Sequence, residues 1–257
     1  MEYIIICLVA FAASILTFFS GFGLGTILLP VFSLFFPVEI AIALTGVVHF
    51  FNNIYKFVLV GKNANKNVLI YFGLPAVIAS FIGAYLLLNI TDLKPLYQYQ
   101  ISNQVFTITP VKLIIAILLI VFAILELLPF FKKLHFKKKH LPIGGLLSGF
   151  FGGLSGHQGA LRSAFLINAG LTKEVFIGSA VVISAFVDFT RISIYSTRFL
   201  KSGLKDNIPL ILCATISAII GAYFGNKLLK KITLEFIQKL VAILLISISI
   251  ALGAGLL

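Results

Sequence analysis

Long apolar stretches alternate with short polar connectors along the whole chain. Eight apolar elements are predicted, at residues 4–36, 38–60, 68–89, 110–130, 141–169, 173–195, 207–229 and 234–256. A helix of about twenty apolar residues is long enough to cross a hydrocarbon core roughly 30 Å thick. The pattern therefore predicts an all-α polytopic membrane protein.

Two of these elements are interrupted by glycine-rich runs. The first run reads Ser-Gly-Phe-Gly-Leu-Gly-Thr at 20–26, and the second reads Leu-Ser-Gly-His-Gln-Gly-Ala at 154–160. In addition, Ile-Gly-Ala-Tyr occurs at 82–85 and again at 220–223. Paired interruptions in corresponding positions are typical of secondary transporters with internal repeats. We predict two homologous repeats, each with a glycine-broken or re-entrant element and about three transmembrane helices. They occupy 1–131 and 141–257, joined by a basic cytoplasmic linker at 132–140.

The relative orientation of the two repeats stays open. If each broken element crosses the membrane once, the repeats are parallel. If each enters as a helical hairpin and returns, three crossings per repeat remain and the repeats are inverted. Either arrangement leaves three basic residues outside, so the positive-inside rule does not decide. The element at 141–169 is too short for two full spans and has central glycines, which favours the inverted arrangement.

The one sizeable polar connector spans residues 91–109. Tyr97, Tyr99 and Ile101 alternate with glutamines, and a turn is expected at Ser102-Asn103. This alternation predicts a β-hairpin on the side opposite the basic linker. We favour an ordered surface loop over a lid.

Composition and charge support a membrane protein. Of the 257 residues 60% are hydrophobic and only 11% charged, whereas a soluble domain has about a quarter charged residues. The net charge of +12 comes from basic residues in the connectors, where anionic lipid headgroups are the natural partners. Nucleic acid, by contrast, requires a folded basic face with stacking aromatics. The sequence leaves open whether copies form a homo-oligomer.

Polar residues near the glycine breaks are the candidate substrate site. Half-helices that begin after a break expose backbone N–H groups and suit an anion. Arg162 is the most informative side chain, because a guanidinium inside a bilayer requires a partner or a water-filled cavity. The predicted substrate-binding residues are Gly23, Gly25, Thr26, Asn52, Asn53, His157, Gln158, Arg162, Ser163 and Arg191.

A second group is predicted to take part in coupling or in ion pairs: His49, Lys56 and Asp188. Asp188 lies three residues before Arg191 on one helical face, and an intrahelical ion pair is the favoured interpretation. Aligning the repeats with a one-residue gap places Asn53 opposite Asp188 and Lys56 opposite Arg191. His49 and His157 could titrate near neutral pH, although a packing role is favoured for each.

The chain resembles the TauE/SafE sulfite-exporter family. The resemblance lies in residues 20–30, Ser-Gly-Phe-Gly-Leu-Gly-Thr-Ile-Leu-Leu-Pro, and 149–156, Gly-Phe-Phe-Gly-Gly-Leu-Ser-Gly. It implies export of sulfite, sulfoacetate or a related organosulfur anion. The chain departs from the family pattern at His157-Gln158 and Leu161-Arg162-Ser163, which implies a more polar pocket with a fixed positive charge.

These observations predict a secondary transporter of a small anion in the cell inner membrane. One alternative is a membrane-embedded enzyme of the lipid-phosphatase type, but Asp188 is the single carboxylate deep in a predicted span. The other is a passive anion channel, which requires a continuous polar pore. No catalytic residue, metal ligand set or cofactor is expected: neither cysteine has metal-ligand spacing, and nucleotide-binding motifs are missing from the sequence.

Overall fold

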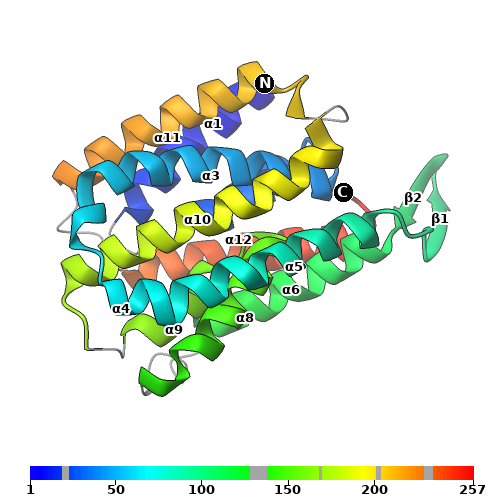
Figure 1. Cartoon of the computed structure of the whole chain (residues 1–257). Coiled ribbons are helices and arrows are strands. Elements are labelled where there is room, and N and C mark those ends of the chain that lie inside the picture. Colours follow the sequence, from blue (N-terminus) through cyan, green and yellow to red (C-terminus); the bar gives the residue numbers. More distant parts are fainter. Residues whose placement is uncertain (19–22, 128–137, 168–169, 201–203, 229–233) are drawn as a thin grey trace.

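The computed structural model describes residues 1–18, 23–127, 138–167, 170–200, 204–228 and 234–257, which are mainly helical (Figure 1). The prediction of an all-α protein is confirmed, apart from one small hairpin. The elements in chain order are α1 (Glu2–Thr17), α2 (Leu24–Ser33), α3 (Val38–Val60), η1 (Gly61–Asn63), α4 (Lys66–Val68), η2 (Leu69–Gly73), α5 (Leu74–Thr91), β1 (Tyr97–Ile101), β2 (Gln104–Ile108), α6 (Pro110–Leu127), η3 (Lys138–His140), α8 (Leu141–Ser155), α9 (Gly159–Ile167), α10 (Lys173–Phe199), α11 (Ile208–Leu228) and α12 (Leu234–Gly253).

The helices have the length and surface of a multi-pass membrane protein. In the described residues, four are long and apolar enough to cross a membrane: Val38–Asn63, Lys66–Thr91, Lys173–Phe199 and Ile208–Lys227. Their outer faces carry apolar side chains such as Val58, which is 78% exposed, whereas Asp188 is completely buried. Apolar surface outside and charge inside is the distribution that a lipid environment favours.

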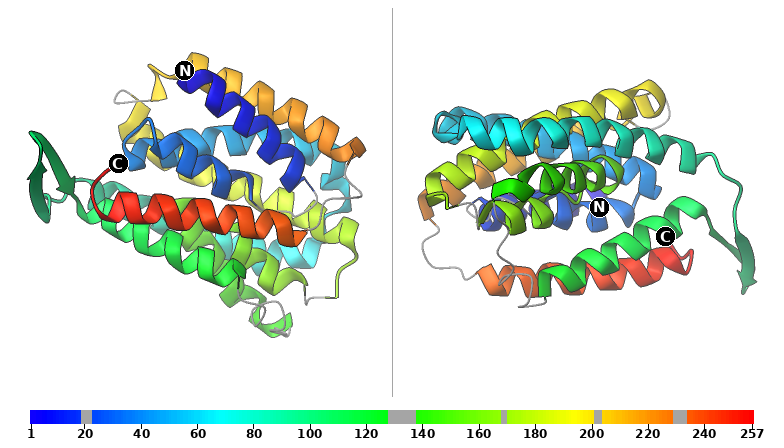
Figure 2. Two further views of the ribbon diagram at one scale, coloured as in Figure 1. Left: turned by 180° about the vertical axis from the view of Figure 1, so that it is seen from behind. Right: turned by 60° about the horizontal axis from the view of Figure 1, so that its bottom comes forward.

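The chain reverses direction at both predicted breaks. Gly23, with φ of 112°, precedes α2, and a Cβ there would lie 2.8 Å from the Thr17 methyl group at the end of α1. Gly156, with φ of 83°, follows α8. Such positive φ values favour glycine. Ser148 of α8 then donates a hydrogen bond to the carbonyl of Gln158, just before α9, at 2.8 Å. Figure 2 shows α2 running back antiparallel to α1. Both broken elements are thus helical hairpins; residues 20–22 of the first glycine run lie outside the described residues.

Each hairpin packs against a helix from the other half of the chain. Helix α1 lies along α11, and α8 lies along α5, while α3 pairs with α10 and α6 with α12. The Ile-Gly-Ala-Tyr motif lies at both of the first two contacts: a Cβ at Gly83 would be 2.0 Å from the Phe150 carbonyl oxygen, and one at Gly221 would be 2.3 Å from that of Phe11. Close backbone approach of this kind requires glycine. The two-repeat organisation stays a prediction, which this matched pairing supports.

Helix α8 packs against η2 and α5 through a regular row of glycines. Gly145, Gly149 and Gly153 are spaced by four residues, so they share one helical face. A Cβ at these positions would lie 2.0–2.2 Å from the carbonyl oxygens of residues 72, 76 and 80, respectively. The two helix backbones are therefore in direct contact along α8.

The predicted β-hairpin is confirmed. Strands β1 and β2 are antiparallel, with Tyr97 opposite Ile108 and Ile101 opposite Gln104. Ser102 and Asn103 form the turn, with φ of 45° and 68°, as a two-residue hairpin loop with the strands' twist requires. The Tyr99 hydroxyl donates a hydrogen bond to the Ala254 carbonyl after α12 at 2.6 Å. The hairpin thus lies at the end of the molecule where α5, α10 and α12 finish.

Candidate functional site: a buried polar cluster around Asp188

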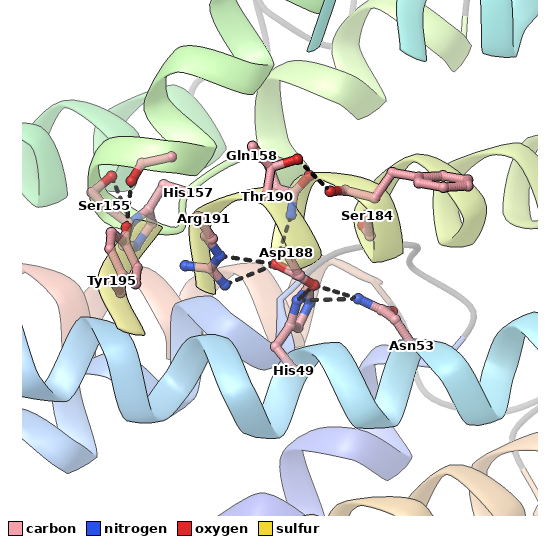
Figure 3. A network of polar contacts seen from close by, with 12 residues as sticks. His49, Asn53, Ser155, His157, Gln158, Ser184, Asp188, Thr190, Arg191 and Tyr195 are labelled. Atoms are coloured by element: carbon pink, nitrogen blue, oxygen red, sulfur yellow. Dashed lines mark hydrogen bonds and ion pairs between the residues drawn. The ribbon is translucent and has the colours of Figure 1, made fainter. Parts of the chain in front are cut away.

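Asp188, in the middle of α10, receives hydrogen bonds from α3 on one of its oxygens. His49 Nδ1 lies 2.6 Å from Asp188 Oδ2, and Asn53 Nδ2 donates to the same oxygen at 3.0 Å (Figure 3). His49 and Asn53 are four residues apart, so they lie on the same face of α3, which packs against α10. A carboxylate can only accept, so His49 carries its proton on Nδ1.

The second carboxylate oxygen is bonded from α10 itself and from the α8–α9 turn. Arg191 Nε lies 3.0 Å and Arg191 Nη2 2.9 Å from Asp188 Oδ1. Gln158 Nε2 donates to this oxygen at 3.2 Å. The Asp188 carboxylate is therefore surrounded by four donor side chains, and the predicted ion pair with Arg191 is present.

Two glycines make room for the Arg191 guanidinium. A Cβ at Gly156 would lie 2.7 Å from Arg191 Nη1, and one at Gly46 would lie 3.4 Å from Arg191 Cζ. Within the described atoms, Arg191 Nη1 is buried without a hydrogen-bond partner. Gly156 thus both permits the turn after α8 and gives space to this cation.

Gln158 connects the carboxylate to a second buried arginine. Arg162 of α9, which is 1% exposed, donates from Nη1 to Gln158 Oε1 at 3.1 Å and to Ser184 Oγ at 2.5 Å. The Gln158 amide therefore accepts from Arg162 through its oxygen and donates to Asp188 through its nitrogen. This series of contacts joins α9 to α10 inside the protein.

Lys56 adds a third buried cation, one helical turn beyond Asn52. With the Asn52 amide in the orientation that satisfies both of its groups, its oxygen accepts from Lys56 Nζ at 3.2 Å, and its nitrogen donates to Ser14 Oγ and to the Ala218 carbonyl, each at 3.2 Å. Lys56 Nζ also lies 5.4 Å from the centre of the Phe18 ring. Lys56 and Arg162 are both almost completely buried, so two basic side chains are held away from water in this part of the protein.

A small cavity lies beside Lys56. It measures about 10 Å³, which is room for roughly one water molecule, and its lining is Thr17, Phe18, Leu24, His49, Asn53, Lys56, Val181 and Ser184. Leu24 begins α2, whose first helical hydrogen bond runs from Ile27 N–H to the Gly23 carbonyl at 2.9 Å. The N–H groups of residues 24–26 precede that bond, and the positive end of the α2 dipole therefore faces this region.

Most of the predicted site residues gather here, and three of those described below do not join the contacts. The polar contacts described above include eight of them: His49, Asn52, Asn53, Lys56, Gln158, Arg162, Asp188 and Arg191. Gly25 adjoins this group, because a Cβ added at Gly25 would lie 3.6 Å from His49 Cδ2. His157 instead stacks on Phe122 with ring centres 5.4 Å apart, and its Nδ1 lies 3.1 Å from the Ser155 carbonyl. Ser163 Oγ is buried without a partner among the described atoms. Thr26 is buried in α2. Whether any of them binds substrate stays a prediction.

Sequence reasoning missed two members of the network. Ser184, which binds Arg162 and lines the cavity, lies four residues before Asp188 on the same face of α10. Tyr195, seven residues after Asp188, is completely buried and donates its hydroxyl hydrogen to the Gly153 carbonyl. The signal was a row of polar positions at helical spacing, 184, 188, 191 and 195, along an otherwise apolar helix.

Comparison with known proteins identifies the family. No curated protein and no solved structure matches the chain. The sequence model of the sulfite exporter TauE/SafE family matches residues 6–252, nearly the whole chain. The multi-pass helical fold and a buried cationic cluster fit that assignment, and the chain therefore belongs to the TauE/SafE family of sulfite-exporter-type membrane transporters.

Proposed function

We propose that this protein is a secondary transporter that exports a small sulfur oxyanion, such as sulfite or sulfoacetate, across the cell inner membrane. One observation carries the proposal: Lys56 lines a cavity, and Arg162, which is also buried, donates a hydrogen bond to Ser184 in the wall of the same cavity. Burying like charges is unfavourable unless an anion is placed between them. Among the described buried side chains, three cations accompany a single carboxylate.

The geometry supports an anion site bounded by Lys56, the first turn of α2 and Ser184. Ser184 also holds Arg162, whose planar guanidinium suits two oxygens of one anion. Free N–H groups at a helix start stabilise negative charge without needing a cationic side chain. The cavity holds only about one water molecule in this conformation. Substrate binding therefore requires the helices around the cavity to separate.

The arrangement of the hairpins supports inverted repeats at 1–131 and 141–257. The α1–α2 hairpin opens toward the end of the molecule with the β-hairpin, and the α8–α9 hairpin opens toward the opposite end (Figures 1 and 2). Three crossings then remain in each half. Basic residues follow α3 and precede α8 and α10 at this second end: Lys62, Lys66, Lys138, Lys139 and Lys173. By the positive-inside rule, that end is cytoplasmic, and the described part of the linker, Lys138–His140, lies there.

The two alternative functions fit less well. A phosphatase needs a carboxylate or histidine free to act on substrate, but Asp188 is surrounded by four donors. A channel needs a continuous polar pathway, whereas the cavity beside Lys56 has room for roughly one water molecule.

Transport by purified protein in liposomes tests the proposal. Efflux of sulfite, sulfate, thiosulfate, sulfoacetate and acetate would be compared for the wild type, Lys56→Met and Arg162→Met. We expect transport of a sulfur oxyanion and its loss in both variants. Arg198→Met is the matched control, because Arg198 pairs with Asp92 at the surface. Failure of every sulfur anion to move, or unchanged efflux by both buried-site variants, would refute the proposal.

A further inference from the structure

We infer that the His49–Asp188 pair is a proton-binding site that is thermodynamically linked to the anion site, so that one proton and the anion bind together. The inference rests on the proposed function, since it concerns the same cavity. Its geometric basis is that His49 contacts the Asp188 carboxylate through Nδ1 and is also one of the residues that line the cavity.

The exposure of the two partners shows how a proton reaches the pair. The Asp188 side chain is 0% exposed, whereas that of His49 is 11% exposed. Access from the cavity therefore passes through the imidazole. Because Nδ1–H is donated to Asp188, Nε2 is the nitrogen left to accept a proton. The proton adds to Nε2, the ring becomes an imidazolium that still donates to Asp188, and release reverses the same step.

The charges around His49 decide the sign of the linkage. On α10, the charged groups that face His49 are Asp188 and Arg191. Arg162 of α9 is connected to Asp188 through Gln158. Lys56 is on α3, as His49 is, and lines the same cavity. Helix α2 contributes no titratable side chain, only the positive end of its dipole. On α1 and α11, the groups that adjoin this part of α3 are the uncharged Ser14, Thr17 and Ala218.

These charges leave a surplus of positive charge that an anion would offset. With His49 neutral, the described cluster has three cations and one carboxylate, a net of +2, and protonation of His49 raises this to +3. The additional charge is unfavourable in an empty site and favourable beside an anion. By linkage, a proton on His49 strengthens anion binding to the same extent that the anion strengthens proton binding. Proton and anion consequently cross the membrane in the same direction.

Calorimetry of the purified full-length protein tests this inference. Sulfoacetate, which keeps its charges through the neutral range, and sulfite would be titrated in two buffers that differ in ionisation enthalpy, which gives the number of protons taken up. We expect the wild type to take up protons when it binds. We also expect its dissociation constant to rise with pH, by up to about tenfold per pH unit for one linked proton. His49→Gln should bind without this uptake and without this pH dependence.

The matched control is His157→Gln, because His157 is also buried but stacks on Phe122 outside the cavity. It should retain wild-type proton uptake. Sulfite titrates by itself, but that contribution is common to all variants and cancels in the difference. Binding without proton uptake by the wild type, or equal uptake by His49→Gln, would overturn the inference while leaving the proposed function intact. If neither anion binds the wild type, the proposed function itself fails. If His49→Gln does not fold, His49→Asn takes its place in the same comparison.

Discussion

Asn53 of α3 donates a hydrogen bond to the carboxylate of Asp188 on α10 at 3.0 Å. The alignment of the two predicted repeats places these residues at corresponding positions, so counterparts meet where α3 packs against α10. An amide opposite a carboxylate can donate a hydrogen bond, whereas a second carboxylate would repel it. The difference between the two halves at this position therefore has a direct electrostatic reason.

Replacing this amide by a carboxylate should disrupt the site. In Asn53→Asp two carboxylates face each other, so one must take up a proton or move away. We expect a lower melting temperature and sulfite binding weakened by about tenfold or more, as like charges in contact oppose each other by several kcal/mol. Thermal unfolding and calorimetry measure both. Asn89→Asp, at an exposed position on α5, is the control; equal behaviour of the two variants would contradict the prediction.

Sulfite binding should depend on both the charge and the planar shape of the Arg162 side chain. Arg162→Met is expected to reduce sulfite binding by at least about tenfold, since hydrogen bonds to charged groups contribute roughly 1.5–3 kcal/mol. Arg162→Lys should fall between this variant and the wild type, because an ammonium lacks the planar fork that suits two oxygens of one anion. Binding isotherms of folded protein check the order, and a lysine variant with wild-type affinity would be inconsistent with bidentate recognition.

The glycine row of α8 gives a stability prediction. A Cβ at Gly149 would lie 2.0 Å from the Ala76 carbonyl oxygen, so Gly149→Ala must push α8 away from α5. We expect a loss of about 1–3 kcal/mol, the usual range for overpacking, seen as a lower melting temperature. Gly253→Ala is the control, because its nearest neighbour, the Ala116 Cβ, would lie at 3.4 Å. Equal melting temperatures for both variants would argue against direct backbone contact.

The two ends of the molecule should be accessible from opposite sides of the membrane. After Cys7 and Cys213 are replaced by serine, single cysteines at Ser102, in the β-hairpin turn, and at Lys138, before α8, would be labelled in intact cells. An impermeant maleimide should modify the first from outside and the second only after lysis. Labelling of both from one side would reject the whole topology, whether the repeats are parallel or inverted.

The positions of the helices could be predicted from the sequence because the length of an apolar stretch, and the glycines that interrupt or end it, are local signals. Helix α3 begins and ends at the predicted residues 38 and 60, and the β-hairpin turn is at Ser102-Asn103. Helix α10 continues four residues beyond the predicted end at 195. There the Ser196 and Thr197 hydroxyls donate to carbonyls three residues earlier, so these polar residues are accommodated within the helix.

The contacts of the site could be predicted only in part. Asp188 and Arg191 are three residues apart on one helix, so their ion pair follows from helical geometry alone. The hydrogen bonds from Gln158 to Asp188 and from Arg162 to Gln158 join separate elements. They depend on how the α8–α9 hairpin packs against α10. His157, adjacent to Gln158, points instead toward Phe122 of α6, a direction that spacing along the chain does not determine.

The contacts of α1 with α11 and of α8 with α5 have a consequence for how the chain can be divided. A cut between residues 132 and 140 would produce two fragments, each carrying a broken hairpin whose supporting helix is in the other fragment. Neither fragment could bury its small-residue face alone. The two would have to assemble by exchanging hairpins, as the subunits of an intertwined dimer do, and co-expressed fragments should reconstitute the protein where either fragment by itself does not.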